Sequence, residues 1–128
     1  MSYYFSLSLL MGKYSYLTIE FVMVNSILIY SDKNLQSSRN IWISIEEGDT
    51  LHVIQHDMGL LTEMICSDDD YERELSNIPL DKLKEILNLN RVEDIFEEFK
   101  KRFNKGDSFD RIQEFLSEFG IPYEYSSY

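Results

Sequence analysis

The chain has 128 residues, enough for one domain and too few for two independent hydrophobic cores. Hydrophobic residues make up 44% of it and charged residues 27%, a composition that is typical of globular proteins and excludes a disordered or fibrous chain. The 23 acidic and 12 basic side chains give a formal net charge of −11, and a field of this sign repels phosphate backbones and anionic lipids, so a nucleic-acid or membrane partner is not expected.

The first half of the chain, up to about Asn77, is rich in β-branched and aromatic residues, which favour strands. Between two such runs lies the segment 47–49, with Gly48 at its centre, and it predicts a hairpin because glycine adopts the positive φ of a tight turn. The pattern leaves open whether the second and third predicted strands are one. The predicted strands span residues 3–10, 16–24, 26–30, 41–45 and 50–55.

A second hairpin is predicted from two apolar runs, 60–66 and 71–75, that flank the polar segment 67–70. Aspartate and serine favour turns because their side chains bond to the nearby backbone. The competing interpretation is a helix that starts at Asp68–Asp70, with the carboxylates at its positive end, and continues through Arg73 and Leu75.

After Ile78 the apolar spacing becomes helical. Pro79 suits the first position of one helix. Asn90 is the expected cap of a second helix, with Glu93 as its capping-box partner. The apolar stripe of the first helix is Leu80, Leu83, Ile86 and Leu87, and that of the second is Val92, Ile95, Phe96, Phe99 and Phe103.

A third helix is expected to be capped by Asp107 or Ser108 and closed by Gly120 and Pro122. The segment 123–128 that follows can extend along a sheet edge. The apolar stripe of this helix is Phe109, Ile112, Phe115, Leu116 and Phe119.

The order of these elements, strands first and then helices, lacks the βαβ alternation of a parallel sheet. The predicted fold class is therefore α+β: an antiparallel sheet from the N-terminal half, with about three C-terminal helices packed on one face. Residues 1–128 are expected to form one domain.

Residues that could support catalysis are few. On a strand, His52 and His56 share a face about 13 Å apart, too far for one metal ion. On a helix their spacing suits zinc, yet Val53 stands where the H-E-x-x-H motif needs Glu. The segment around Cys66 is predicted to be a buried strand, which disfavours a nucleophile. The sequence thus predicts no catalytic, cofactor or metal site, and a small enzyme using His52, His56 and Asp57 is only the third hypothesis.

The expected compartment is the cytoplasm. A single cysteine permits no intramolecular disulfide and fits a reducing environment. Polar residues interrupt the apolar stretches at 1–11 and 16–30, so neither predicts a signal peptide or a membrane span.

The acidic segments are the predicted partner-binding residues. Asp68–Asp70 could bind a divalent cation, but the central Gly and terminal Glu of an EF-hand are absent. A negative field combined with many aromatic residues favours an inhibitor that covers a basic cleft. The rival surface is the tail with Tyr123, Tyr125 and Tyr128. The predicted binding residues are Glu46, Glu47, Asp49, Asp68, Asp69, Asp70, Tyr71 and Glu72.

The C-terminal half also carries a resemblance. Asp70-Tyr71-Glu72, then Ile78-Pro79 before a Leu-rich helix, and finally the end of the third helix at 118–125 (EFGIPYEY) resemble the immunity proteins of bacterial contact-dependent inhibition and other polymorphic toxin systems. The resemblance implies a cytoplasmic protein that binds a cognate toxin domain, often a nuclease, and blocks its active site. The alternative is a phage-encoded acidic inhibitor or DNA mimic. The sequence leaves the oligomeric state open.

Overall fold

The structure is a computed structural model that describes residues 3–6, 21–24, 26–34, 36–46, 49–66 and 70–128. Its elements in chain order are β1 (Tyr3–Ser6), β2 (Phe21–Val24), β3 (Ser26–Lys33), β4 (Ser37–Glu46), β5 (Thr50–Gly59), α1 (Leu60–Cys66), β6 (Asp70–Pro79), α2 (Leu80–Leu87), α3 (Glu93–Arg102), α4 (Ser108–Glu118) and β7 (Glu124–Ser127).

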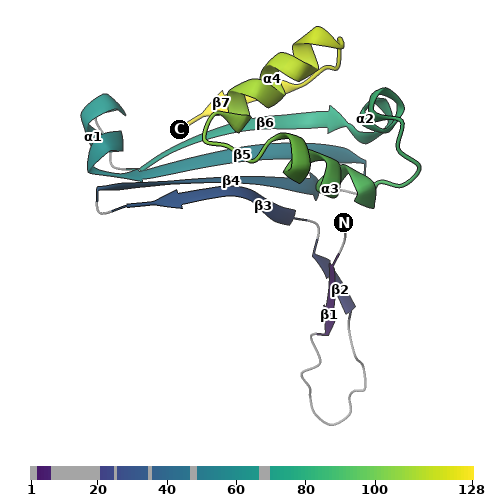
Figure 1. Cartoon of the computed structure of the whole chain (residues 1–128), viewed down its shortest axis with the longest axis horizontal. Helices are drawn as coiled ribbons and strands as arrows, with labels where there is room; N and C mark the ends of the chain where they lie inside the picture. The colour runs from purple at the N-terminus through teal and green to yellow at the C-terminus, as the bar shows by residue number, and fades with distance from the viewer. Residues whose placement is uncertain (1–2, 7–20, 25, 35, 47–48, 67–69) are drawn as a thin grey trace.

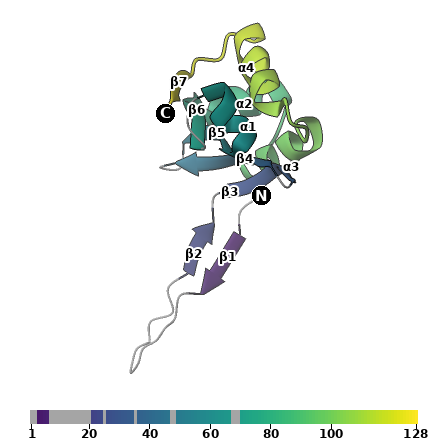
Figure 2. The same cartoon turned by 90° about the vertical axis from the view of Figure 1, so that its left-hand side faces the viewer.

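Five strands form an antiparallel sheet in the order β3-β4-β5-β6-β7, and the helices lie on one side of it (Figures 1 and 2). Strands β1 and β2 pair with each other in a separate two-stranded sheet. The final strand, β7, pairs with β6 at the sheet edge, as predicted for the segment 123–128. The predicted α+β class is confirmed.

The strands of the main sheet are longer than the sequence predicts. The predicted hairpin is confirmed by the pairing of Glu46 with Thr50, although residues 47 and 48 lie outside the described residues. Strands β2 and β3 belong to different sheets, so the second and third predicted strands are separate. Parts of the two N-terminal predictions, residues 7–10 and 16–20, also lie outside the described residues.

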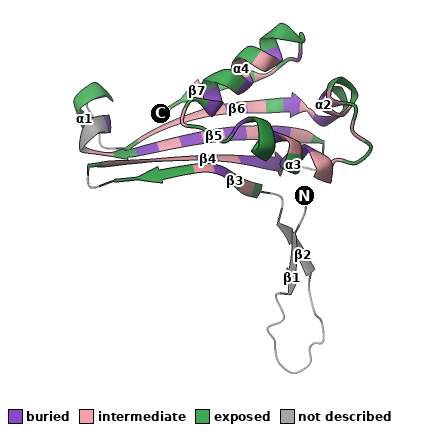
Figure 3. Cartoon of the chain, in the orientation of Figure 1, coloured by how far each residue is buried: buried purple, intermediate pink, exposed green. Residues whose placement is uncertain are grey.

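The core lies between the sheet and helices α2, α3 and α4 (Figure 3). Alternate residues of β4 and β5 point into it, because successive side chains of a strand face opposite sides of the sheet. The largest fully buried side chains are Phe96, Phe99, Phe109, Ile41, Ile43, Leu51, Leu75, Ile78, Leu80, Leu83, Ile95 and Ile112.

Helix α4 ends as the sequence predicts. Gly120 has a φ of +67°, which glycine adopts without strain. Its N–H donates to the Ser117 carbonyl at 3.3 Å, while the N–H of buried Ile121 donates to the Leu116 carbonyl at 2.8 Å. This pair of bonds is the Schellman motif, which satisfies carbonyls left over at the helix end.

The helix starts differ from the prediction. Val92, and not Asn90, precedes the first residue of α3, because the chain already turns at Arg91, whose carbonyl accepts a bond from the Asp94 N–H. Asp107 does precede α4, but its carboxylate pairs with Arg111 and makes no capping bond. Neither helix has a side-chain cap.

Two predicted core residues lie at the surface: Ile86 is 38% exposed and Phe119 is 47% exposed. Leu87, the next residue of α2, packs against the core while Ile86 is exposed, and Phe119 follows the last residue of α4. Pro79 is the last residue of β6 and directly precedes α2, so this helix starts one residue later than predicted.

The predicted second hairpin is wrong, because residues 60–66 form helix α1. Short apolar runs have no periodicity that separates a strand from a helix, and Leu, Glu and Met favour helices. The competing helix through Arg73 and Leu75 is also wrong, since both lie in β6. Met64 and Ile65 are 73% and 76% exposed, so the segment preceding Cys66 is not a buried strand.

Gly59 allows the turn from β5 into α1. Its φ is +112°, and a Cβ placed there would overlap the Gln36 carbonyl and lie 2.7 Å from the Ser37 Cα. We expect Gly59→Ala to lower the free energy of unfolding by at least about 2 kcal/mol, because backbone strain and overlap add. Urea unfolding tests this against Gly120→Ala, where no atom lies within 4 Å of a new Cβ and the expected loss is about 1 kcal/mol. Equal losses of unfolding free energy in the two variants would contradict the inference that position 59 requires glycine.

Candidate functional site

One face of the five-stranded sheet carries none of the described helices. We call it the open face, and cross-strand pairing defines it: Trp42 pairs with Ile54 on β5, which in turn pairs with Glu74 on β6. Its described side chains include Ser26, Leu28, Ser31, Lys33, Ser38, Asn40, Trp42, Ser44, Glu46, Thr50, His52, Ile54, His56, Met58, Asp70, Glu72, Glu74, Ser76, Glu124 and Ser126.

Trp42 and Ile54 form the half-buried centre of the open face. The indole of Trp42 stacks on the ring of His56, with centroids 6.5 Å apart and planes inclined by 29°. Leu28, which pairs with Trp42 from β3, is 41% exposed. An aromatic ring held by a neighbour and flanked by exposed apolar area is typical of the centre of a protein-binding surface.

The predicted acidic residues lie at both ends of this open face. Asp70 and Glu72 lie at the end of the sheet where β6 begins. Glu46 lies on the same face at the opposite end, beside exposed Asp49. The partners of Glu46 and Asp70 on β5, Thr50 and Met58, are eight positions apart, or about 26 Å at 3.3 Å per residue. The two groups of predicted acids are therefore not adjacent; Glu47, Asp68 and Asp69 lie outside the described residues.

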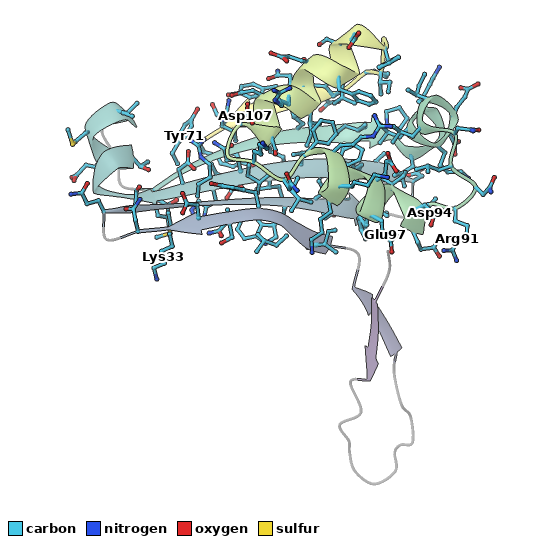
Figure 4. All side chains as sticks on the ribbon, viewed as in Figure 1. Lys33, Tyr71, Arg91, Asp94, Glu97 and Asp107 are labelled. Atoms are coloured by element: carbon cyan, nitrogen blue, oxygen red, sulfur yellow. The ribbon has the colours of Figure 1, made fainter. Side chains whose placement is uncertain are left out.

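Tyr71 is separated from its acidic neighbours by the pleat of β6. It pairs with Asp57 and lies on the helix side of the sheet, whereas Lys33 points away from that side (Figure 4). It therefore cannot act as the aromatic residue of the same surface as Asp70 and Glu72. Trp42 is the aromatic residue that shares the open face with Asp70 and Glu72. The sequence alone does not single it out, although it alternates with three buried isoleucines.

Both histidines lie on the open face, as the strand interpretation predicts. His52 Nδ1 lies 2.8 Å from Glu74 Oε2, and the Tyr128 hydroxyl donates to Glu74 Oε1 at 3.1 Å. This hydrogen bond, followed by the negative charge of Glu74, raises the pKa of Tyr128 above its ordinary value. His56 Nε2 contacts the Asp70 carboxylate. Each histidine thus has its own acidic partner.

On the helix side, a cleft of about 560 Å³ lies between the sheet and α1. We call it the Arg39 cleft, after one of the two arginines that line it. Arg39 donates to both carboxylate oxygens of Asp57, at 2.7 and 2.9 Å, and to the Gly106 carbonyl at 2.9 Å. The hydrogen bond to Asp57 raises the pKa of Arg39, so this guanidinium stays charged.

Gln55 is the buried polar residue of this cleft. It is 2% exposed, and its Nε2 donates to Asp57 Oδ2 at 3.1 Å. Because the carboxylate accepts from this nitrogen, the amide orientation is fixed, and Oε1 is buried with no hydrogen-bond partner among the described residues. A buried carbonyl oxygen without a donor costs about 1–3 kcal/mol, so such atoms call for an explanation.

Aromatic and charged side chains complete the walls. Tyr30, Tyr71 and Tyr125 all line the cleft. Burial, and then the charge of Asp32, raise the pKa of Tyr30. Arg73 bonds to Asp110 at 3.1 Å and lies 4.3 Å from the ring centroid of Phe109. Both arginines of the cleft therefore have carboxylate partners.

A signal for this cleft is present in the sequence. Gln55 and Asp57 continue the alternation of Leu51 and Val53, so the strand places two polar groups on its apolar side. Buried polar groups of that kind require partners, and Arg39 supplies one through a cross-strand pair that only the register reveals.

Comparisons with known proteins name no relative. No protein-family model matches the sequence, and neither a curated protein nor a solved structure matches it. Among the described residues, no group of three or more His, Cys, Asp or Glu side chains is placed to hold a metal ion. None of the helices in that part of the chain has the length and apolar character needed to cross a membrane.

Proposed function

We propose that this protein binds a basic protein domain through the open face and neutralises it, as an immunity protein neutralises its cognate toxin. The observation that carries the proposal is the open face itself: an aromatic and aliphatic centre between two acidic ends. The protein acts in the cytoplasm as an inhibitor and not as an enzyme.

The negative charge of the open face indicates a positively charged partner. The described open-face side chains include Glu46, Asp70, Glu72, Glu74 and Glu124 but only one lysine, Lys33. A surface of this sign attracts a basic cleft and accelerates encounter. Enzymes that act on nucleic acids present such clefts, because they bind phosphates. A toxin nuclease is therefore the partner that this surface fits best.

A DNA mimic is the second candidate. Asp70, Glu72 and Glu74 lie at alternate positions of β6, and so form a row of three carboxylates on one face. Two of the three, however, pair with histidines, and an apolar centre adjoins them. If this candidate is correct, the protein displaces DNA from unrelated DNA-binding proteins; an immunity protein protects against its cognate toxin alone.

Growth protection tests the function directly. The product of the reading frame immediately upstream is expressed in bacteria with and without this protein. If that product is the toxin, it stops growth alone, and co-expression restores growth and gives a complex that co-purifies. Growth arrest that co-expression leaves unchanged, with no complex, would contradict the proposal.

Charge reversal tests the surface. We expect Asp70→Lys/Glu72→Lys to slow association with the toxin about tenfold or more at low salt, because steering depends on the local field. The control, Glu97→Lys/Glu114→Lys, makes the same change in net charge at exposed helix positions and should alter the rate by less than about twofold. Stopped-flow association at several salt concentrations measures both. Equal slowing by the two variants would assign the effect to net charge and not to this surface.

A further inference from the structure

The Arg39 cleft lies on the opposite side of the sheet from the open face, and the proposed inhibitor function leaves it unused. It combines an accessible volume of about 560 Å³ with a buried acceptor, Gln55 Oε1, that has no donor. Small-molecule sites have volumes of this order and a few fixed polar groups. Gln55 lines the cleft, and a ligand that brings an N–H group would satisfy the oxygen after a small rotation of the Gln55 side chain exposes this atom.

A donor lies beside that acceptor. Arg39 NH2 and Gln55 Nε2 both bond to Asp57 Oδ2, at 2.9 and 3.1 Å, so the guanidinium and the amide are neighbours. The three bonds of Arg39 to described residues use three of its five N–H groups. The remaining two can donate to a carbonyl oxygen. The pair therefore matches a ligand with an N–H next to a C=O.

The walls favour a planar ligand. Tyr30, Tyr71 and Tyr125 line the cleft, and Tyr71 projects from β6 on the helix side (Figure 4). Aromatic rings and arginine planes stack on nucleobases, whose faces are planar and apolar. An extended peptide would instead need a long groove or a free strand edge.

The charges favour a neutral ligand. The carboxylate of Asp57 neutralises the charge of Arg39, and that of Asp110 neutralises the charge of Arg73. Asp32 adds a further negative charge at the rim. Among the described residues that line the cleft, a phosphate would meet no unpaired cation, and the whole chain carries a net charge of −11.

We propose that the Arg39 cleft binds a neutral nucleoside whose base carries a lactam, an N–H adjacent to a C=O, as in uridine and guanosine. The base N–H donates to Gln55 Oε1, its carbonyl accepts from Arg39, and tyrosine rings flank the base. Because this cleft and the open face lie on opposite sides of the sheet, either assignment can fail while the other holds.

Matched ligands test the hydrogen bond. Uridine, guanosine, 3-methyluridine and uridine 5′-monophosphate are titrated into the ¹⁵N-labelled protein and followed by NMR. We expect saturable shifts of the Gln55 side-chain amide and the Arg39 Nε–H with uridine or guanosine. 3-Methyluridine lacks the N–H and should bind at least about tenfold more weakly than uridine, because the oxygen stays unpaired. The monophosphate should bind no more tightly than uridine.

Matched variants locate the site. Gln55→Leu should remove the preference for uridine over 3-methyluridine, so that the affinities for the two nucleosides differ by less than about twofold. Gln113→Leu on α4 should keep the preference. If Gln55→Leu does not fold, Tyr71→Ala provides the second test. Tyr71 is a half-buried residue of the cleft wall, and its loss should weaken the binding of uridine about tenfold. Absence of saturable binding by both lactam nucleosides, equal binding of 3-methyluridine, or tighter binding of the monophosphate would overturn the proposal.

Discussion

Replacing Phe99 by Ala is expected to lower the free energy of unfolding by about 3–5 kcal/mol, a large part of the stability of a small domain. Phe99 is fully buried, and its ring lies edge-on to Phe103 with centroids 5.2 Å apart. The substitution removes apolar contacts and leaves a cavity between α3 and the sheet that close-packed neighbours cannot fill.

Phe119→Ala is the matched control. The sequence places both rings in apolar helix stripes, but Phe119 is 47% exposed and contacts Phe115 at the end of α4. Its loss should cost about 1 kcal/mol or less. Urea unfolding followed by circular dichroism measures both variants. A similar loss in the two would mean that the core does not lie between α3 and the sheet as described.

Most of the fold follows from periodicity. The alternation of Ile41, Ile43 and Ile45 gives both the strand and its buried face, and the change to helical spacing after Ile78 gives α2, α3 and α4. Such signals are strong because each element buries one continuous face. The α+β class follows from their order alone.

Helix α1 was missed because its signal is weak. Seven apolar-rich residues fit a strand or a helix equally, and a helix of this length depends on its surroundings. Gly59, with a φ of +112°, turns the chain out of β5 immediately before it. The sequence contains this glycine but does not show that its φ is positive.

The candidate surface was only partly predictable. The sequence indicates exposed acids at turns, but turns at the two ends of ten-residue strands lie far apart. Which acids share a face depends on strand register, and one residue along β6 separates Glu72 on the open face from Tyr71 on the helix side. The pairing that joins Trp42, Ile54 and Glu74 is likewise set by tertiary structure.

Trp42→Ala is expected to weaken binding of the proposed toxin partner by about 2–4 kcal/mol, or roughly 30- to 900-fold, with the change mainly in the dissociation rate. Trp42 lies centrally on the open face, where its stacking on His56 fixes the ring before binding. A preordered aromatic side chain loses little entropy on association, so more of its contact energy contributes to affinity.

The effect of Trp42→Ala on binding should differ in kind from the effect of reversing the acidic charges. Trp42→Ala should leave the salt dependence of association unchanged, since it removes no charge, while Asp70→Lys/Glu72→Lys changes mainly the association rate. Phe119→Ala, at an exposed ring on α4, is the control and should bind the toxin within about twofold of the unchanged protein. Surface plasmon resonance on folded variants gives both rates. If Trp42→Ala dissociates no faster than Phe119→Ala, the open face is not the binding surface, and Tyr123 and Tyr125, whose side chains lie off that face, become the next residues to test.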